Sequence, residues 1–294
     1  LTVEPKVRLI TSDKYTCVTN RQSAFMELGE RLGCGSAVII GISIGVIGGG
    51  GSILAVPVLA YLFSVNEKVA TAYSLFIVGA SALVGGLKQH LKGYVDWRTA
   101  VVFGLPAIVG VSVVRRFVVP ALPEVLFNID DFEFTRRMGM FGLFAILMIP
   151  AAFSMLKTRK EKKQKGDGTV KYNYPLIIGE GLLVGGITGM IGAGGGFLII
   201  PALVILANVE MKVAVGTSLI IIAFKSLLGF FIGDALTMTI DWMFLTVFTL
   251  ISFVGIFIGS YLSNFIDGNK LKKGFGYFIF VMAIFIFYME FFVN

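Results

Sequence analysis

Long apolar segments follow one another through most of this sequence and limit what it can fold into. They span residues 36–48, 52–64, 68–90, 98–119, 137–156, 174–191, 196–207, 212–233, 242–264 and 271–292. Most approach the length of about 20 residues with which a helix crosses a hydrocarbon core of roughly 30 Å. The composition agrees, since 56% of the residues are hydrophobic and 15% are charged, against about 25% charged in soluble domains. The pattern predicts an all-α polytopic membrane protein.

Two pairs of these segments are too short for each member to cross a bilayer alone. The pairs are 36–48 with 52–64 and 174–191 with 196–207, and a glycine run interrupts each pair. Short segments broken by glycine or proline at matching places in two halves mark the binding sites of many transporters. We expect each pair to form a hairpin of broken helix.

The two halves of the chain repeat one another at a constant offset. The positions that match are Gly41, Gly45, Ile47, Gly48, Gly50, Gly51, Leu54 and Pro57 with Gly185, Gly189, Ile191, Gly192, Gly194, Gly195, Leu198 and Pro201. The same offset carries Lys68, Val69, Ala70, Ser74 and Leu75 onto Lys212, Val213, Ala214, Ser218 and Leu219, and Asp96-Trp97 meets Asp241-Trp242 one residue later. This register favours an internal duplication over chance likeness between glycine-rich helices.

The repeat divides the chain into four parts. These are a polar N-terminal segment at 1–35, a first transmembrane repeat at 36–156, a basic linker at 157–173 and a second transmembrane repeat at 174–294. Loops rich in lysine and arginine stay in the cytoplasm, so we place the linker there. The net charge of +7 is then a property of cytoplasmic loops, and no nucleic-acid partner is expected.

Loop charge also favours opposite orientations of the two halves. If 174–207 is a hairpin, Asp234 and Asp241 lie outside without a basic neighbour in sequence, and the lysines that begin the last segment lie inside. Each half then has one hairpin and three crossings, an odd number, so the repeats are inverted. Arg115 and Arg116, near the outer end of their helix, are unfavourable for this scheme.

The two glycine runs are the predicted anion site. They contain Gly49, Gly50, Gly51 and Ser52 in the first hairpin and Gly194, Gly195 and Gly196 in the second. Glycine lets the backbone approach a ligand closely, and the first N–H groups of the helix that follows are unpaired and carry the positive end of its dipole. The alternative is that the glycines only permit a turn and close packing. Neither run is followed by Lys-Ser/Thr, so nucleotide binding is rejected.

Hydroxyl groups follow each hairpin about one turn into the next helix. They belong to Tyr73 and Ser74 in the first half and to Thr217 and Ser218 in the second. Such hydroxyls can donate hydrogen bonds to the oxygens of an anion. They can equally bond between helices, as polar residues in membranes commonly do.

Lys225 is the most informative single residue, because it lies near the centre of an apolar segment. A charge there costs at least about 2.5–3.5 kcal/mol and is functional by default. We expect it to be the positive partner of a bound anion, with Ser81 at the matching place in the first half. A structural pair with a carboxylate, or a side chain that reaches the interface, is the alternative. Glu180 is a candidate for that pairing or for carrying a coupling proton, and a place at the cytoplasmic rim is equally open.

The sequence offers no catalytic or metal-binding set. It has one histidine, His90, and two cysteines, Cys17 and Cys34, which form no metal motif. We therefore expect no enzyme activity, no cofactor and no metal.

The two glycine motifs resemble the TauE/SafE sulfite exporter family. The residues that carry the resemblance are Ile47-Gly48-Gly49-Gly50-Gly51-Ser52-Ile53-Leu54-Ala55-Val56-Pro57 with Ala72-Tyr73-Ser74-Leu75, and Gly192-Ala193-Gly194-Gly195-Gly196-Phe197-Leu198-Ile199-Ile200-Pro201 with Ala214-Val215-Gly216-Thr217-Ser218-Leu219. The likeness covers residues 36–292, nearly the whole chain. The first copy departs from the Gly-Thr-Ser pattern with Ala72-Tyr73-Ser74, which argues against a symmetric site.

The resemblance implies a secondary transporter that exports sulfite, sulfoacetate or a related organosulfonate across the bacterial inner membrane. The sulfur specificity comes from the resemblance alone. A gated anion channel, or a permease for another small anion, would use the same helix ends and remains the alternative.

Overall fold

In the part of the chain that the computed structural model describes, six helices are long and apolar enough to cross a membrane. The structure describes residues 35–63, 66–123, 125–129, 132–156, 174–192, 194–205 and 210–293, so the N-terminal segment before Gly35 and the linker 157–173 lie outside the described residues. The spans are α3 (Glu67–Leu91), α4 (Trp97–Val113) continued by η3 (Val114–Val118) and α5 (Val119–Ala121), α6 (Arg136–Leu156), α9 (Met211–Gly229) continued by η4 (Phe230–Asp234), α10 (Trp242–Leu262) continued by η5 (Ser263–Phe265), and α11 (Gly268–Tyr288) continued by η6 (Met289–Val293). The prediction of an all-α polytopic membrane protein is confirmed at this level.

The two predicted hairpins are present as pairs of shorter helices. The first consists of the helix Gly35–Ile47 and a return arm made of η1 (Gly49–Gly51), α2 (Ser52–Pro57) and η2 (Val58–Leu62). The second consists of α7 (Tyr174–Ile191) and α8 (Gly196–Ile205). Each hairpin turns at its glycine run, as the sequence predicts.

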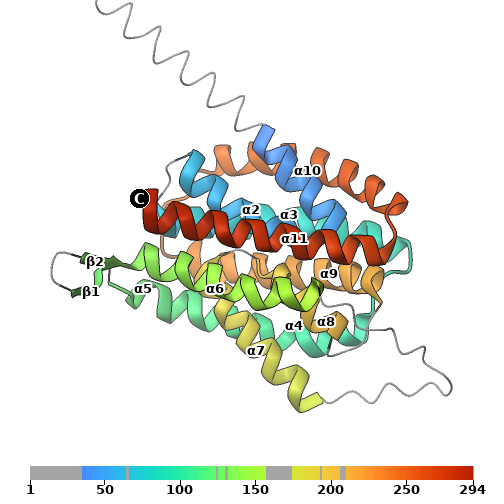
Figure 1. Ribbon diagram of the computed structural model, residues 1–294, viewed down its shortest axis with the longest axis horizontal. Coiled ribbons are helices and arrows are strands. Elements are labelled where there is room, and N and C mark those ends of the chain that lie inside the picture. Colours follow the sequence, from blue (N-terminus) through green and yellow to red (C-terminus); the bar gives the residue numbers. More distant parts are fainter. Residues whose placement is uncertain are drawn as a thin grey trace, which may run out of the picture.

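A short pair of antiparallel strands was not predicted from the sequence. β1 (Val125–Ile129) pairs with β2 (Phe132–Thr135), with a register shift between Val125 and Phe127. The pair projects from one end of the helices, next to α5 and the start of α6 (Figure 1).

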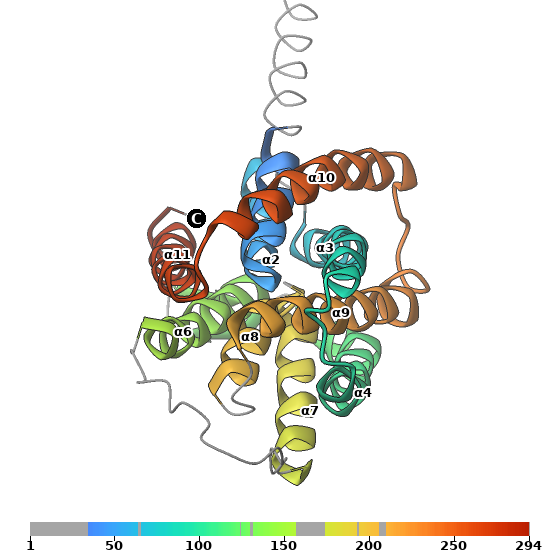
Figure 2. The same cartoon turned by 90° about the vertical axis from the view of Figure 1, so that its right-hand side faces the viewer.

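The helices pack reciprocally between the two halves. α3 packs on α9, and α6 packs on α11, and each of these pairs joins matching parts of the two repeats. Viewed along the long helices, α9 lies between α3 and α4, while α6 and α11 form the opposite flank (Figure 2). α3 and α9 are the most deeply buried spans.

Each hairpin also packs on a span of the other half through glycines. A Cβ atom at Gly41 would overlap the carbonyl oxygen of Ser252 in α10, and one at Gly185 would overlap that of Ala107 in α4. Gly41 and Gly185 hold the same place in the sequence repeat, and so do α10 and α4. Small residues bring membrane helices into such backbone contact because apolar side chains gain little by leaving lipid for one another.

The outer surface of the bundle suits lipid. On α10 the exposed side chains recur every three or four residues and are apolar or aromatic, namely Val247, Leu250, Val254, Phe257 and Tyr261. Apolar side chains of this kind face the hydrocarbon in a membrane protein. The helix can be exposed to lipid because its backbone N–H and C=O groups are already paired within it.

Asp96 and Asp241 begin α4 and α10, which lie at matching places in the repeat. The carboxylate of Asp96 accepts hydrogen bonds from the N–H groups of Arg98 and Thr99, and that of Asp241 accepts one from Phe244. Aspartate is a strong N-cap because it satisfies N–H groups that the helix leaves unpaired. The Asp-Trp pairs that stood out in sequence therefore start two equivalent spans.

We expect Gly185→Ala to destabilise the protein. The added methyl would overlap the carbonyl of Ala107, and overpacking costs about 1–3 kcal/mol, so the thermal unfolding midpoint in detergent should fall. Gly179→Ala is the matched control in the same helix, because nothing lies within 4 Å of its Cβ position. Equal midpoints for the two variants would contradict this account of the α4–α7 contact.

Candidate functional site

The two glycine runs meet at the centre of the molecule. A Cβ atom at Gly49 would overlap the Cα atom of Gly196, and one at Gly196 would overlap that of Gly49. Gly48 and Gly192, at matching places, have φ angles of 77° and 75°, which favour glycine. The structure therefore brings the two predicted tips together, backbone against backbone.

The first tip reaches the start of α9, and the second tip reaches the start of α3. The Cβ position of Gly48 lies 2.9 Å from Cγ1 of Val215, near the start of α9, whereas that of Gly192 overlaps Cβ of Thr71, near the start of α3. Val215 and Thr71 are related by the repeat offset. The same contact is thus made twice, once by each hairpin.

The other glycines and Ser52 are buried in the packing of the tips. Gly50 packs against the ring of Phe275, and Gly51 against the backbone of Ile44. The hydroxyl of Ser52 donates to the carbonyl oxygen of Gly49 at 2.6 Å, which closes the first turn of the return arm. Gly194 faces Ser52, whose Cβ lies 3.3 Å from the Gly194 Cβ position.

Lys225 reaches the tip of the second hairpin. Its side chain is fully buried on α9, and Nζ donates to Oγ1 of Thr188 on α7 at 2.9 Å. Nζ lies 2.7 Å from the position that a Cβ would take at Gly195, so glycine leaves room for the ammonium there. An ammonium has three N–H donors, and the described residues account for one of them.

Glu180 is not the partner of Lys225. Among the described residues the bond of Lys225 is to Thr188, which lies eight residues, or about 12 Å of helix, beyond Glu180. Glu180 is half-buried on α7. The suggested ion pair is therefore not formed, and the suggested role in proton coupling stays a prediction.

Tyr73 and Thr217 each form a hydrogen bond with the backbone at the start of a span in the other half. The hydroxyl oxygen of Thr217 accepts from the N–H of Asp96 at 2.9 Å, and that of Tyr73 accepts from the N–H of Asp241 at 2.8 Å. These four residues are pairwise equivalent in the repeat. The substitution of tyrosine for threonine in the first copy therefore keeps the hydrogen bond.

The two neighbouring serines differ in their contacts. The hydroxyl of Ser218 donates to the carbonyl of Val215 at 2.9 Å and lies 3.4 Å from the Cβ position of Gly48. The buried hydroxyl of Ser74 has no hydrogen-bond partner within the described chain. Ser81, which matches Lys225 in the repeat, bonds the hydroxyl of Ser252 at 3.1 Å, so the first half has no cation at the place equivalent to Lys225.

Sequence reasoning missed a second buried cation, Arg115. The sequence places it near the outer end of a helix, where a charge is unfavourable for the predicted topology, but its side chain is buried and Nη1 pairs with Oδ1 of Asp234 at 3.1 Å. Nη1 also lies 3.2 Å from Oγ1 of Thr71. Asp234, expected to lack a basic neighbour, thus finds one in space. Arg115 is consequently no loop charge and does not count against the scheme.

A cavity of about 170 Å³ opens at the end of the molecule where α3 ends and α9 begins. Its lining is mostly polar and consists of Gln89, Tyr94, Lys212, Val215, Ser263, Asn264 and Leu271. Val215 also lies beside Gly48 of the first hairpin tip, so one lining residue of the cavity packs on that tip. Lys225 lies ten residues, about 15 Å, further along α9.

Basic residues gather around this cavity. Lys92 donates to Oδ1 of Asn264 at 2.7 Å. Partial burial and the neighbouring charges of Lys88 and Lys212 lower the pKa of Lys92. The charges of Lys88 and Lys212 beside Lys92 make the potential there locally positive, which attracts anions.

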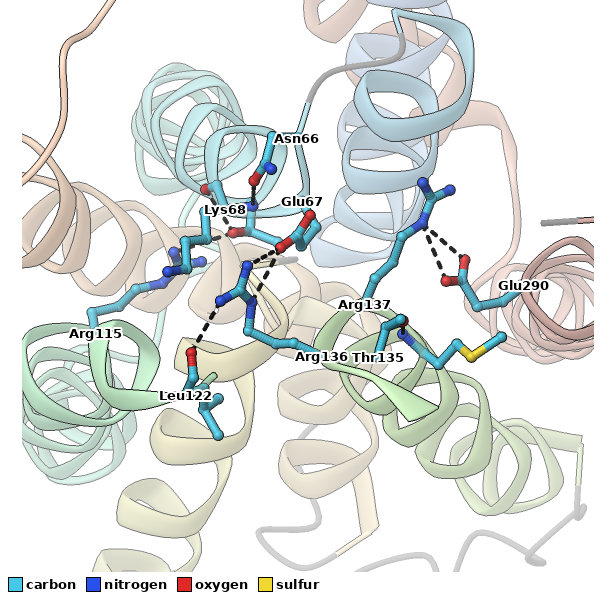
Figure 3. A network of polar contacts seen from close by, with 11 residues as sticks. Asn66, Glu67, Lys68, Arg115, Leu122, Thr135, Arg136, Arg137 and Glu290 are labelled. Carbon is cyan, nitrogen blue, oxygen red and sulfur yellow. Dashed lines mark hydrogen bonds and ion pairs between the residues drawn. The ribbon is translucent and has the colours of Figure 1, made fainter. Parts of the chain in front are cut away.

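Ion pairs bridge the opposite end of the molecule (Figure 3). Arg136, at the start of α6, pairs with Glu67 at the start of α3 and donates to the carbonyl of Leu122 at 3.0 Å. Arg137 pairs with Glu290 of η6 at 3.1 Å. The hydroxyl of Tyr61, in the return arm of the first hairpin, donates to Glu290 at 3.0 Å. These contacts connect α3, α6, η6 and the first hairpin.

Removing the hydroxyl of Thr188 should destabilise the protein. Thr188→Val keeps the shape of the side chain but leaves the Lys225 ammonium without this acceptor, which costs about 1–3 kcal/mol for a buried group. Denaturant titration of the purified protein measures the loss. Thr188→Ser retains the hydroxyl and should cost less, and an equal loss in both variants would show that the bond contributes nothing.

Comparison with known proteins agrees with the architecture. A family model described as "Sulfite exporter TauE/SafE" matches residues 34–286. A "Probable membrane transporter protein" of Xylella fastidiosa (strain 9a5c) is 29% identical over 256 residues, covering 86% of this chain and 92% of the relative. The "Probable membrane transporter protein YunE" of Bacillus subtilis (strain 168) is 28% identical over 230 residues, covering 70% and 80%. No solved structure gives a significant match. The chain belongs to the TauE/SafE sulfite exporter family of membrane transporters.

Proposed function

We propose that this protein exports a small sulfur-containing anion, such as sulfite, sulfoacetate or a related organosulfonate, across the bacterial inner membrane. The observation that carries the proposal is the buried ammonium of Lys225 at the tip of the second hairpin. The sulfur chemistry of the substrate is taken from the family to which the chain belongs.

The surroundings of Lys225 favour an anion over a cation or a neutral molecule. A charge at this depth is costly, and the described residues offer it a neutral hydroxyl rather than a carboxylate. The first N–H groups of α8 begin at Gly196, next to Gly195, and add the positive end of a helix dipole. An oxyanion at the tip would neutralise Lys225 and accept hydrogen bonds from these N–H groups.

The hydroxyl groups that follow each hairpin supply further donors in this proposal. The oxygens of Tyr73 and Thr217 accept from backbone N–H groups, so their own protons are available for an anion. Ser74 has a buried hydroxyl without a partner in the described chain. Ser52 and Ser218 already donate to carbonyls, and an anion would have to compete for their protons.

The proposed transport mechanism uses inverted repeats at 36–156 and 174–294. Its support is the set of contacts made twice at the repeat offset, such as Gly48 with Val215 and Gly192 with Thr71. Hairpin tips that each reach the start of a span in the other half suit two halves inserted from opposite faces. Alternating access then follows from a movement of one repeat against the other.

In this proposal the molecule is in a state that is open to the cytoplasm and closed to the outside. The cavity at Lys212 and Val215 would open to the cytoplasm, with the loop 157–173 on the same side. The ion pairs of Arg136 and Arg137 would close the outer end. Opening that end requires these pairs to separate, and export of an anion from a negative interior gains about 2.3 kcal/mol per charge per 100 mV.

Transport of labelled sulfite and sulfoacetate into proteoliposomes tests the function. Lys225→Ala should reduce saturable flux by about tenfold or more, equivalent to about 1.4 kcal/mol, because the anion loses its buried counter-charge. Lys273→Ala, at an exposed lysine of α11, is the matched control and should transport normally. Imposed pH and voltage gradients, with Glu180→Gln, show whether protons are coupled.

Two results of this assay would count against the proposal. Flux that persists in Lys225→Ala would remove that residue from the site. Flux that rises linearly with concentration would indicate an anion channel instead of a carrier.

Labelling from each side of the membrane tests the orientation. In a background with Cys17→Ser and Cys34→Ser, Asn264→Cys at the cavity should react only with reagent on the cytoplasmic side. Val125→Cys, an exposed position in β1, should react only from the outside. Reaction of both from one side would refute the placement of the two ends.

A further inference from the structure

Arg115 uses only one of its three nitrogens within the described chain. Nη1 donates to Asp234 and to Thr71. Nε and Nη2 are buried and have no hydrogen-bond partner there, and neither has Oδ2 of Asp234. A buried donor left unpaired costs about 1–3 kcal/mol, and more when it is charged. Such groups are rare and call for an explanation, which includes an ion bound in another state.

The unused nitrogens form one edge of the guanidinium. Nε–H and Nη2–H point in the same direction and make the fork that binds two oxygens of a carboxylate or phosphate at once. Asp234 occupies the end of the group instead and leaves this edge open. Asp234 thus orients Arg115 without bonding the Nε/Nη2 edge of its guanidinium.

The open edge lies against the second hairpin tip. Nη2 is 2.5 Å from the position that a Cβ would take at Gly192, where φ is 75°. On the same tip, Gly195 adjoins Nζ of Lys225. The tip therefore lies between two buried cations, one from α9 and one from η3.

The two cations are at different depths. Asp234, which holds Arg115, lies nine residues beyond Lys225 on the same helix and its continuation, or about 14 Å along the axis. Both Arg115 and Asp234 lie in π-helical turns, which occur frequently at functional sites. Arg115 is thus on the side of the tip that faces the bridged end of the molecule.

We propose that the Nε/Nη2 edge of Arg115 is a second anion-binding site, which holds two oxygens of a sulfonate or sulfite group between Lys225 and the outer end. The inference rests on the proposed anion transport. It adds a second binding site on the transport path and a preference for oxyanions over chloride. A planar fork fits two oxygens of one group and gives no such advantage to a spherical halide. Arg115 would therefore distinguish oxyanions from chloride.

Equilibrium binding of labelled sulfite and sulfoacetate to the purified protein in detergent, with chloride as competitor, tests the proposal. Arg115→Lys keeps the positive charge beside Asp234 but lacks the fork, and it should weaken oxyanion binding by about tenfold or more. Chloride competition should become relatively stronger. Arg116→Lys, at the exposed neighbouring position, is the control and should bind as the unaltered protein does.

A second variant covers the risk that Arg115→Lys folds poorly. Arg115→Gln combined with Asp234→Asn removes both charges, so no buried charge of the pair is left alone, and it too should lose oxyanion affinity. If either variant is folded and binds both oxyanions like the unaltered protein, Arg115 is only a structural partner of Asp234 with a water on its open edge, and the inference is wrong. If the unaltered protein binds neither oxyanion, the proposed function itself fails, and this site fails with it.

Discussion

The rest of the structure depends on the contact between the backbones of Gly49 and Gly196. A side chain at either position would overlap the backbone of the other hairpin, so the two hairpins can meet here only through glycine. That contact fixes how far each hairpin penetrates and therefore which residues of α3 and α9 its turn reaches. Irregular backbone at this depth is tolerated only when protein surrounds it or when it lines a cavity, and here the long helices surround it.

Because the glycine runs of the tips contain no charged residue, the surrounding spans must provide any charge at the centre. α9 provides Lys225 and η3 provides Arg115, and the second tip touches both. The first tip is near Ser218 and the polar cavity instead. The two tips thus share one backbone plan but have different electrostatic surroundings.

Much of this arrangement could be predicted from the sequence. Segment length identified the crossings, the glycine runs identified the hairpins, and the repeat offset identified pairs that prove to be spatially equivalent, such as Asp96 with Asp241. The partners of the buried charges could not be predicted. Thr188 contacts Lys225 because of how α7 and α9 face one another, and Arg115 and Asp234 each stand near the end of an apolar segment, far apart in the chain. The strand pair β1–β2 lies between two predicted crossings, where the sequence analysis predicts no element.

The packing of the helix Gly35–Ile47 has a consequence for how the protein is made. Its glycine face packs on α10, where Gly41 contacts Ser252 and Gly255. These two residues leave the ribosome about 210 residues after Gly41. At about 5–20 residues per second the delay is roughly 10–40 s. During that time the first helix waits in the membrane or the insertion machinery without its partner. Nascent chains halted before α10 would therefore be the most exposed to quality control, and assembly of the first half must await synthesis of the second.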